Sequence, residues 1–290
     1  MSPSKIEKTI IARQTEFLKH KDVDEKGYLA HPQDNLIEPF PHWEQIKKEF
    51  NEGKGSELKR SGGKPPKFLS VRSSSALCVN NFAPFKAHGS KLSFSDYSGF
   101  DETRFEKEQP TGLDGTQPHL DFYLENKTTI IGIESKFTEY FVPKRPNHPT
   151  KHQDPTKSRK NNLEKYCNKK ELNYLPKGFQ ESIIEHYFAD NEPQHLDVAQ
   201  LIKHTIGLLN NRREKKVVLV YLYWEPLNPT VDNLFVEHRR DIEKFKSLME
   251  RFIKFVPWSY PEFWKLYENE DLLKEHIRKV RDRYEFEIKS

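Results

Sequence analysis

The sequence has few cysteines and no recognisable zinc-binding motif. Only two cysteines occur, Cys78 and Cys167, and their positions match no pair of metal ligands. The chain has 12 histidines, yet neither His-Glu-x-x-His nor Cys-x-x-Cys is found. We expect both cysteines to be reduced thiols of a cytosolic protein.

Several other signatures are missing as well. Gly63-Lys64 has no glycine five positions earlier and is followed by Pro65, so it is not a phosphate-binding P-loop. No Gly-x-Ser-x-Gly occurs, which leaves serine-hydrolase chemistry unsupported. No apolar stretch is long enough to span a membrane, and residues 1–20 are charged throughout and lack the apolar core of a signal peptide. These absences predict a cytoplasmic protein that has no membrane partner.

Charge is abundant and locally uneven. Among 290 residues 32% are charged, the net charge is only +4, and the chain is long enough for one elaborated domain with a sizeable core. Two positive runs stand out: Lys54, Lys59, Arg60, Lys64, Lys67 and Arg72, then Lys144, Arg145, Lys151, Lys157, Arg159 and Lys160. Such loops suit contacts with phosphates, and the alternative is that they are solvated loops that keep the protein soluble.

Residues 118–137, PHLDFYLENKTTIIGIESKF, have the alternation of a β-hairpin. In the first strand Leu120, Phe122 and Leu124 fall on one side, and His119, Asp121 and Tyr123 fall on the other. In the second strand Ile131, Ile133, Ser135 and Phe137 share one side, and Gly132, Glu134 and Lys136 share the other. A turn at 125–128 joins the two strands.

Matching the two apolar faces brings Asp121, Glu134 and Lys136 together, with Gly132 leaving room above them. Two carboxylates supply hard oxygen ligands for Mg²⁺, which can polarise a phosphodiester. Lys136 would orient the attacking water or neutralise charge at the phosphorus. Hydrolysis of a nucleic-acid backbone is the simplest reaction that uses all three. Because Glu-x-Lys recurs in this charged chain, the alternative is an amphipathic hairpin with a salt-bridged outer face.

A buried helix and a buried strand follow further along the chain. The run Leu196–Asn210 has a helical pattern that is apolar over much of its surface, and 217–224, VVLVYLYW, is typical of a strand covered on both faces. The polar residues of the helix form one narrow stripe: Gln200, Lys203, His204 and Gly207.

The order of hairpin, helix and strand, with these residues, resembles the PD-(D/E)XK nuclease superfamily of restriction-endonuclease-like proteins, and most closely its bacterial restriction-enzyme-like members. In that resemblance Asp121 matches the first acidic position, Glu134 and Lys136 match the (D/E)XK half-motif, and Gln200 matches a glutamine on the following helix. Leu120 stands where many members have proline. The resemblance implies an α/β core of a helix, a three-stranded antiparallel meander, a helix and a strand.

The resemblance extends less specifically to 53–58 and 73–80. It implies a helix from Ser73 to about Phe82, capped by serine and followed by Pro84 beyond its end. Members often place a glutamate from this helix near the metal, and this helix has none. Glu57 and Glu106 are the substitutes, and each is otherwise a surface glutamate.

We expect one elaborated nuclease domain over 1–290: an N-terminal helix and basic loops (1–70), the core (71–225) with a helical insertion (138–195), and a helical C-terminal region (226–290). The first strand of the core meander is expected around Arg104–Glu108. The elements expected outside the core are a helix at Lys5–Lys21, insertion helices near Leu163–Glu171 and Phe179–Phe188, and two helical stretches in Asn233–Glu285 separated by Pro257 and Pro261. Seven aromatics of this last region are expected to pack in the core and not to stack on bases: Phe245, Phe252, Trp258, Tyr260, Phe263, Trp264 and Tyr267.

The hypothesis is a Mg²⁺-dependent endonuclease that acts on DNA in restriction or defence, with Asp121 and Glu134 as metal ligands, Lys136 as the catalytic cation and Gln200 beside it. Mn²⁺ is expected to substitute for Mg²⁺. The resemblance implies DNA in preference to RNA, and a two-fold dimer for specific double-strand cutting. The competing hypothesis is a non-catalytic nucleic-acid-binding protein that keeps the fold. His119 and His204 are left open between the active site and a structural role.

Overall fold

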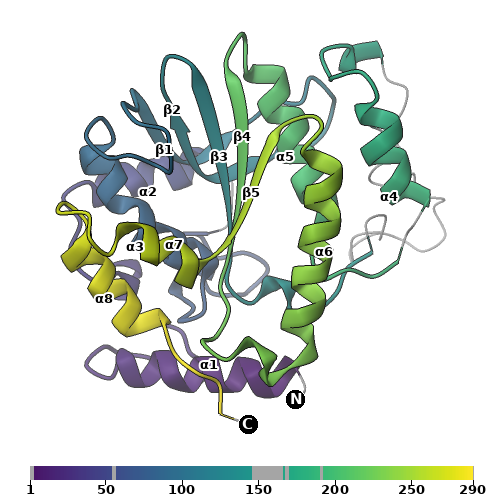
Figure 1. Cartoon of the computed structure of the whole chain (residues 1–290). Coiled ribbons are helices and arrows are strands. Elements are labelled where there is room, and N and C mark those ends of the chain that lie inside the picture. Colours follow the sequence, from purple (N-terminus) through teal and green to yellow (C-terminus); the bar gives the residue numbers. More distant parts are fainter. Residues whose placement is uncertain (1–2, 54–56, 146–165, 167–169, 190–191, 290) are drawn as a thin grey trace.

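The computed structural model of the chain (Figure 1) describes residues 3–53, 57–145, 166, 170–189 and 192–289. Lys54, most of the second basic run, Cys167 and most of the helix expected near 163–171 lie outside these residues. Within the described part of the insertion, a π-helical turn at Gln180–Glu185 runs into the short helix α4 (His186–Ala189), as the pattern near Phe179–Phe188 predicts.

A five-stranded mixed sheet forms the centre of the molecule (Figure 1). Its strands, in both chain and spatial order, are β1 (Glu102–Glu108), β2 (His119–Glu125), β3 (Thr129–Lys136), β4 (Lys216–Tyr223) and β5 (Lys254–Ser259). The first two pairings are antiparallel and the last two are parallel. The predicted meander followed by a helix and a buried strand is confirmed, in an arrangement consistent with a restriction-endonuclease-like core.

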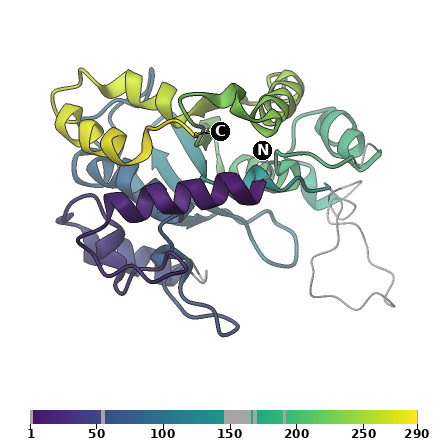
Figure 2. The same cartoon turned by 90° about the horizontal axis from the view of Figure 1, so that it is seen from below.

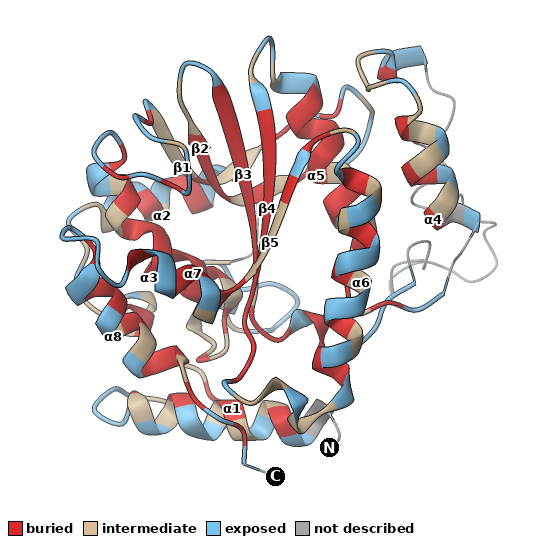
Figure 3. Cartoon of the chain, viewed as in Figure 1, coloured by how far each residue is buried: buried red, intermediate tan, exposed pale blue. Residues whose placement is uncertain are grey.

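Helices cover both faces of the sheet. On one face Phe82 of α3 (Ser74–His88) stacks on Phe122 of β2, with ring centroids 4.8 Å apart. On the other face α5 (Val198–Asn211) packs so closely that a Cβ on Gly132 would lie 2.9 Å from Leu208. β3 and β4 are consequently buried along almost their whole lengths (Figure 3).

The remaining helices extend these two layers. α6 (Asn233–Met249) lies on the same face as α5. Glu134 of β3 contacts His204 of α5, and Tyr221, its neighbour on β4, shares a hydrogen bond with His238 of α6. α7 (Tyr260–Tyr267) lies on the α3 face, where Phe263 meets Phe82. Three more helices complete the fold: α1 (Pro3–Phe17), α2 (Trp43–Glu52) beside β1, and α8 (Lys274–Tyr284). Seen from below, α1 crosses the molecule, and the C-terminal segment returns to it (Figure 2).

The expected alternation in β2 is wrong at Leu120. Tyr123 pairs with Gly132, and a Cβ on Gly132 would come within 2.8 Å of Leu120, so Leu120 and Tyr123 lie on one face although they are three residues apart. The alternation therefore breaks at Asp121, between Leu120 and Phe122. Gly132 allows Leu120 and α5 to pack closely against β3. The prediction that it leaves room above the active site is therefore wrong.

The predicted end of α3 is also wrong. The helix starts as expected, with the Ser73 hydroxyl accepting from Ala76 N at 3.1 Å, but it continues through Pro84 to His88. Proline has no N–H to give to the carbonyl four residues earlier, which is that of Asn80. That carbonyl is bonded to His276 Nε2 of α8 at 2.7 Å. A tertiary contact thus replaces the missing helical bond, and the helix persists.

The C-terminal region is mostly helical, as expected, but the segment that separates its helical stretches is a strand that was not predicted. Lys254–Ser259 forms β5, an edge strand of the sheet, and contains Pro257. An edge strand tolerates proline because it pairs on one side only. The predicted packing is confirmed for five of the seven aromatics in this region, which are buried, whereas Phe252 and Trp258 are only partly buried against the core and keep part of their surface exposed.

Candidate active site

Three acidic residues stand side by side on three neighbouring strands. Glu106 of β1 and Asp121 of β2 face each other, between the pairs Phe105↔Phe122 and Lys107↔Leu120. Beyond Phe122↔Ile133 the β2–β3 ladder opens, and Asp121 Oδ2 accepts a hydrogen bond of 2.7 Å from Ser135 N. The side chain of Asp121 thus replaces a backbone partner, and this brings its carboxyl beside Glu134.

Glu106 has an unusual backbone conformation. Its φ is +50°, in the left-handed region that non-glycine residues seldom adopt. A Cβ on Gly53 would lie 2.8 Å from Glu106 Cβ, so only a residue without a side chain fits beside it. The chain holds Glu106 in this position against a backbone preference, which is a feature found often at functional sites.

Glu134 and Lys136 form a buried ion pair that α5 completes. Lys136 Nζ lies 2.5 Å from Glu134 Oε1 and donates to Gln200 Oε1 at 2.9 Å. His204 Nε2 lies 2.9 Å from Glu134 Oε2, yet the two buried atoms are not aligned as a hydrogen bond. Two of the four residues in the predicted polar stripe, Gln200 and His204, therefore contact the predicted hairpin at Lys136 and Glu134.

The carboxylates perturb one another. Burial and the charge of Glu134 raise the pKa of Asp121 well above its usual value. Burial, with the charges of Glu57 and Glu134, raises the pKa of Glu106 to about 8. Burial would also raise the pKa of Glu134, but Lys136 and His204 outweigh it and lower that pKa to about 2. Glu134 is therefore the carboxylate that stays ionised, whereas for Asp121 and Glu106 burial and the neighbouring carboxylates outweigh the positive charges of Lys136 and Lys67.

The site opens into a pocket of about 550 Å³ between the N-terminal end of α3 and the end of β3. Asp121, Glu134, Lys136 and Gln200 all line it, so the structure brings the four predicted site residues together. Glu57, Glu106 and His119 line it too, whereas His204 lies behind Glu134. Sequence reasoning did not single out Glu139, or Arg72 as a site residue, both of which line the pocket.

Two of these lining residues have local structural partners. Glu57 accepts from Lys67 Nζ at 2.8 Å and from the Ser75 hydroxyl at 2.7 Å, which ties the basic loop to α3. His119 Nε2 lies 3.5 Å from Glu108. No local pattern distinguished Glu139, whose carboxylate accepts from the backbone N–H groups of Phe137 and Thr138.

A known family model matches nearly the whole chain. The model of the REase-ARP family, described as "Restriction Endonuclease associating with ARP", matches residues 5–285. The chain belongs to the REase-ARP family. The description of that family names a restriction endonuclease, and the match covers the whole sheet with its acidic pocket. No curated protein and no solved structure matches the chain.

The donor set of this REase-ARP protein fits a magnesium ion in part. Among the residues that the structure describes, no group of three or more His, Cys, Asp or Glu side chains is arranged to hold a metal. Mg²⁺, however, commonly binds through one or two carboxylates and keeps several waters. Glu134 Oε2 is a buried oxygen without a hydrogen-bond partner, and the Asp121 carboxyl lies beside it, where burial and the charge of Glu134 raise the pKa of Asp121. These two oxygen donors fit a hydrated hard cation.

No described helix of this REase-ARP protein is long and apolar enough to cross a membrane.

Proposed function

We propose that this protein is a divalent-metal-dependent endonuclease of the PD-(D/E)XK superfamily that hydrolyses phosphodiester bonds of DNA, in restriction or defence. One observation carries the proposal: Asp121, Glu134 and Lys136 converge in one pocket, at the point where β2 and β3 separate. The description of the REase-ARP family supports the same reaction class.

Asp121 and Glu134 would hold Mg²⁺, or Mn²⁺ in its place. When bound, the metal would supply Lewis-acid polarisation of the phosphodiester and lower the pKa of a water. Lys136 remains charged, because Glu134 and Asp121 raise its pKa well above the usual value despite burial. Gln200 fixes the ammonium group in place, so that the lysine faces the phosphate without searching among rotamers.

The rim of the pocket suits a polyanion. Lys67 and Arg72 belong to the first basic run, and both line the pocket beside the acidic cluster. Charged contacts of this kind hold the nucleic-acid backbone without reading its sequence. We include in the proposal a cytoplasmic location and a two-fold homodimer for cutting both strands.

The test is cleavage of supercoiled plasmid DNA in Mg²⁺ and in Mn²⁺. Wild-type protein should nick or linearise the plasmid, and Asp121→Ala, Glu134→Ala and Lys136→Ala should each lower the rate by roughly 10²–10³-fold. Gln200→Ala should cost less, about 10–100-fold, because it acts through Lys136.

Glu287 and Lys289 provide the matched control, since they repeat the Glu-x-Lys spacing at exposed positions outside the described pockets. The variant Glu287→Ala/Lys289→Ala should cut like the wild type. Plasmid that stays intact in every metal and salt condition would contradict the proposal. It would favour the non-catalytic DNA-binding alternative if the protein still bound the plasmid.

A further inference from the structure

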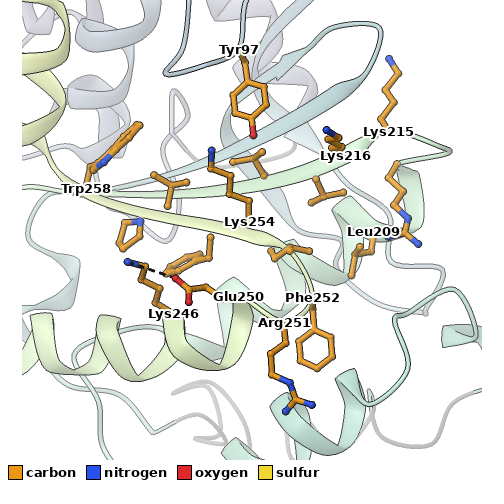
Figure 4. Close-up of a pocket in the computed structure, with 17 residues that line it drawn as sticks. Tyr97, Leu209, Lys215, Lys216, Lys246, Glu250, Arg251, Phe252, Lys254 and Trp258 are labelled. Atoms are coloured by element: carbon orange, nitrogen blue, oxygen red, sulfur yellow. Dashed lines mark ion pairs between the residues drawn. The ribbon is translucent and has the colours of Figure 1, made fainter.

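A second hollow, of about 800 Å³, runs along β5 and the start of β4 (Figure 4). We call it the β5 groove. Six basic residues line it against a single acidic one, Glu250: Arg212, Lys215, Lys216, Lys246, Arg251 and Lys254. They come from three parts of the chain: residues 212–216 at the start of β4, the last turn of α6 with the residues that follow it, and the first residue of β5. Figure 4 labels all of them except Arg212.

The β5 groove is separate from the candidate active site. Lys216, which lines the groove, is the first residue of β4, whereas Lys136 of the active site pairs with Tyr223, the last residue of β4. Seven residue steps of a strand span about 23 Å. The two sites therefore lie at opposite ends of the same strand.

Much of the positive charge in the groove is not neutralised. Arg212, Lys216 and Arg251 form no ion pair with any residue that the structure describes. Lys254 lies 3.7 Å from Asp96, and Lys246 lies 3.8 Å from Glu250. Both pairs are long and exposed, and such pairs contribute little energy. Within the described part of the chain, Lys215 alone among the six basic residues has close side-chain partners, in Glu125 and the Asn126 carbonyl.

Aromatic rings lie among these charges. Tyr97, Phe252 and Trp258 line the groove, and each is partly exposed. Lys254 Nζ lies 5.1 Å from the centre of the Tyr97 ring, and the two side chains approach one another in Figure 4. Basic residues interleaved with accessible aromatics are the usual surface for a single nucleic-acid strand, whose phosphates contact the cations and whose bases stack on the rings.

A peptide that adds a strand to β5 fits this surface less well. β5 is the edge of the sheet, so strand addition is the obvious alternative. However, Pro257 offers no N–H, and Lys254 places a charge on the same edge. Proline and lysine on an edge strand are devices that discourage pairing with another strand.

We propose that the β5 groove binds a single nucleic-acid strand through its phosphates and bases, away from the pocket where cleavage would occur. The choice of nucleic acid as the polyanion rests on the proposed function. A strand held there would anchor the substrate, or an unpaired segment beside it, about 20 Å from the reacting phosphate.

The test is binding of a fluorescent single-stranded DNA oligonucleotide in EDTA, followed by anisotropy over a series of salt concentrations. The groove variant Arg212→Gln/Lys216→Gln should bind more weakly and should lower the slope of log affinity against log salt by about 0.7 for each lost phosphate contact. The matched control Arg240→Gln/Lys265→Gln removes the same charges from exposed positions outside the groove, and it should leave the slope unchanged.

A second variant tests the aromatic part of the proposal. Tyr97→Leu keeps an apolar side chain and every charge, so it should weaken binding of single-stranded DNA and leave binding of heparin, a polyanion without bases, unchanged. The proposal is overturned if groove and control variants behave alike, if duplex is bound and single strands are not, or if Tyr97→Leu weakens both ligands equally.

These outcomes are independent of catalysis, because EDTA removes the metal. Plasmid that stays intact while the groove variants lose affinity would overturn the nuclease and leave the groove standing. Plasmid that is cut while the groove variants bind like wild type would overturn the groove proposal and support the nuclease.

Discussion

Glu106 is the site residue with both an unfavourable backbone conformation and a strongly perturbed pKa. It combines a left-handed φ of +50° with a pKa raised to about 8, and it stands opposite Asp121 in the β1–β2 register. Side-chain burial and the negative charges of Glu57 and Glu134 are the causes of the shift. Between pH 4.5 and about 8, the metal-free folded protein therefore keeps a proton on Glu106 that the unfolded chain releases.

Replacement of Glu106 should therefore stabilise the metal-free protein in a pH-dependent way. The folded pKa of about 8 lies above the ordinary value of 4.5, so the penalty on folding grows as pH rises between these two values. Glu106→Gln should raise the free energy of unfolding by ~2–4 kcal/mol more at pH 8 than at pH 5. Urea titrations in EDTA measure this, with exposed Glu287→Gln as the control. Equal gains at both pH values would show that Glu106 is ionised in the fold.

At the residue scale, alternation was enough to predict that Asp121, Glu134 and Lys136 would meet, whereas the place of Gln200 beside them came from the family resemblance. It could not predict the break at Leu120, because a period of two assumes that the ladder continues, whereas the Asp121 carboxyl takes the Ser135 N–H. Glu57 and Glu106 were identified only as alternatives, since nothing local distinguishes a strand glutamate that turns inward from one in solvent.

At the element scale, a contact from α8 stabilises the part of α3 that contains Pro84. Pro84 leaves the Asn80 carbonyl without its helical donor, and His276 bonds that carbonyl at 2.7 Å. His276→Ala should therefore lower the free energy of unfolding by about 1–3 kcal/mol, because it leaves a buried carbonyl unsatisfied.

A double variant separates this explanation from a general loss of packing. Pro84→Ala supplies the missing N–H, so it should recover part of the stability in the His276→Ala background and less in the wild type. Thermal or urea unfolding of the four proteins completes the cycle. Additive effects would contradict the proposed compensation.

The elements of the core were predictable because buried strands and an amphipathic helix have strong periods. β5 was not, since Pro257 and Pro261 are typical of breaks in a helical region. Proline disqualifies a central strand but not an edge strand, and the position of a strand within a sheet is a tertiary property. The same reason explains α3, where a partner distant in the sequence compensates for Pro84.

At the scale of the whole molecule, the two ends of the chain are joined by one buried guanidinium. Arg283 of α8 donates to Gln14 Oε1 of α1 at 2.9 Å, to the Asn35 carbonyl at 2.7 Å and to Asn35 Oδ1 at 2.5 Å. The side chain is 1% exposed, and burial lowers its pKa. These contacts span up to 269 positions and leave no periodic trace, so sequence patterns cannot predict them.

Loss of the Arg283 contacts should lower the stability of the fold markedly. Arg283→Met leaves three buried acceptors with fewer partners, and we expect the free energy of unfolding to fall by at least about 2 kcal/mol. Arg281→Met on the same helix removes only partly exposed ion pairs to Glu268 and Glu285, so it should cost about 1 kcal/mol or less. Equal losses in chemical denaturation would mean that Arg283 does not hold the termini together.

The central claim is that the carboxylates on neighbouring strands hold a divalent cation. Crystals soaked in Mn²⁺ test it most directly, through anomalous difference density. We predict a peak between the carboxylates of Asp121 and Glu134, and its loss in Asp121→Ala. Absence of a peak there, at a Mn²⁺ concentration that supports DNA cleavage in solution, would contradict the account.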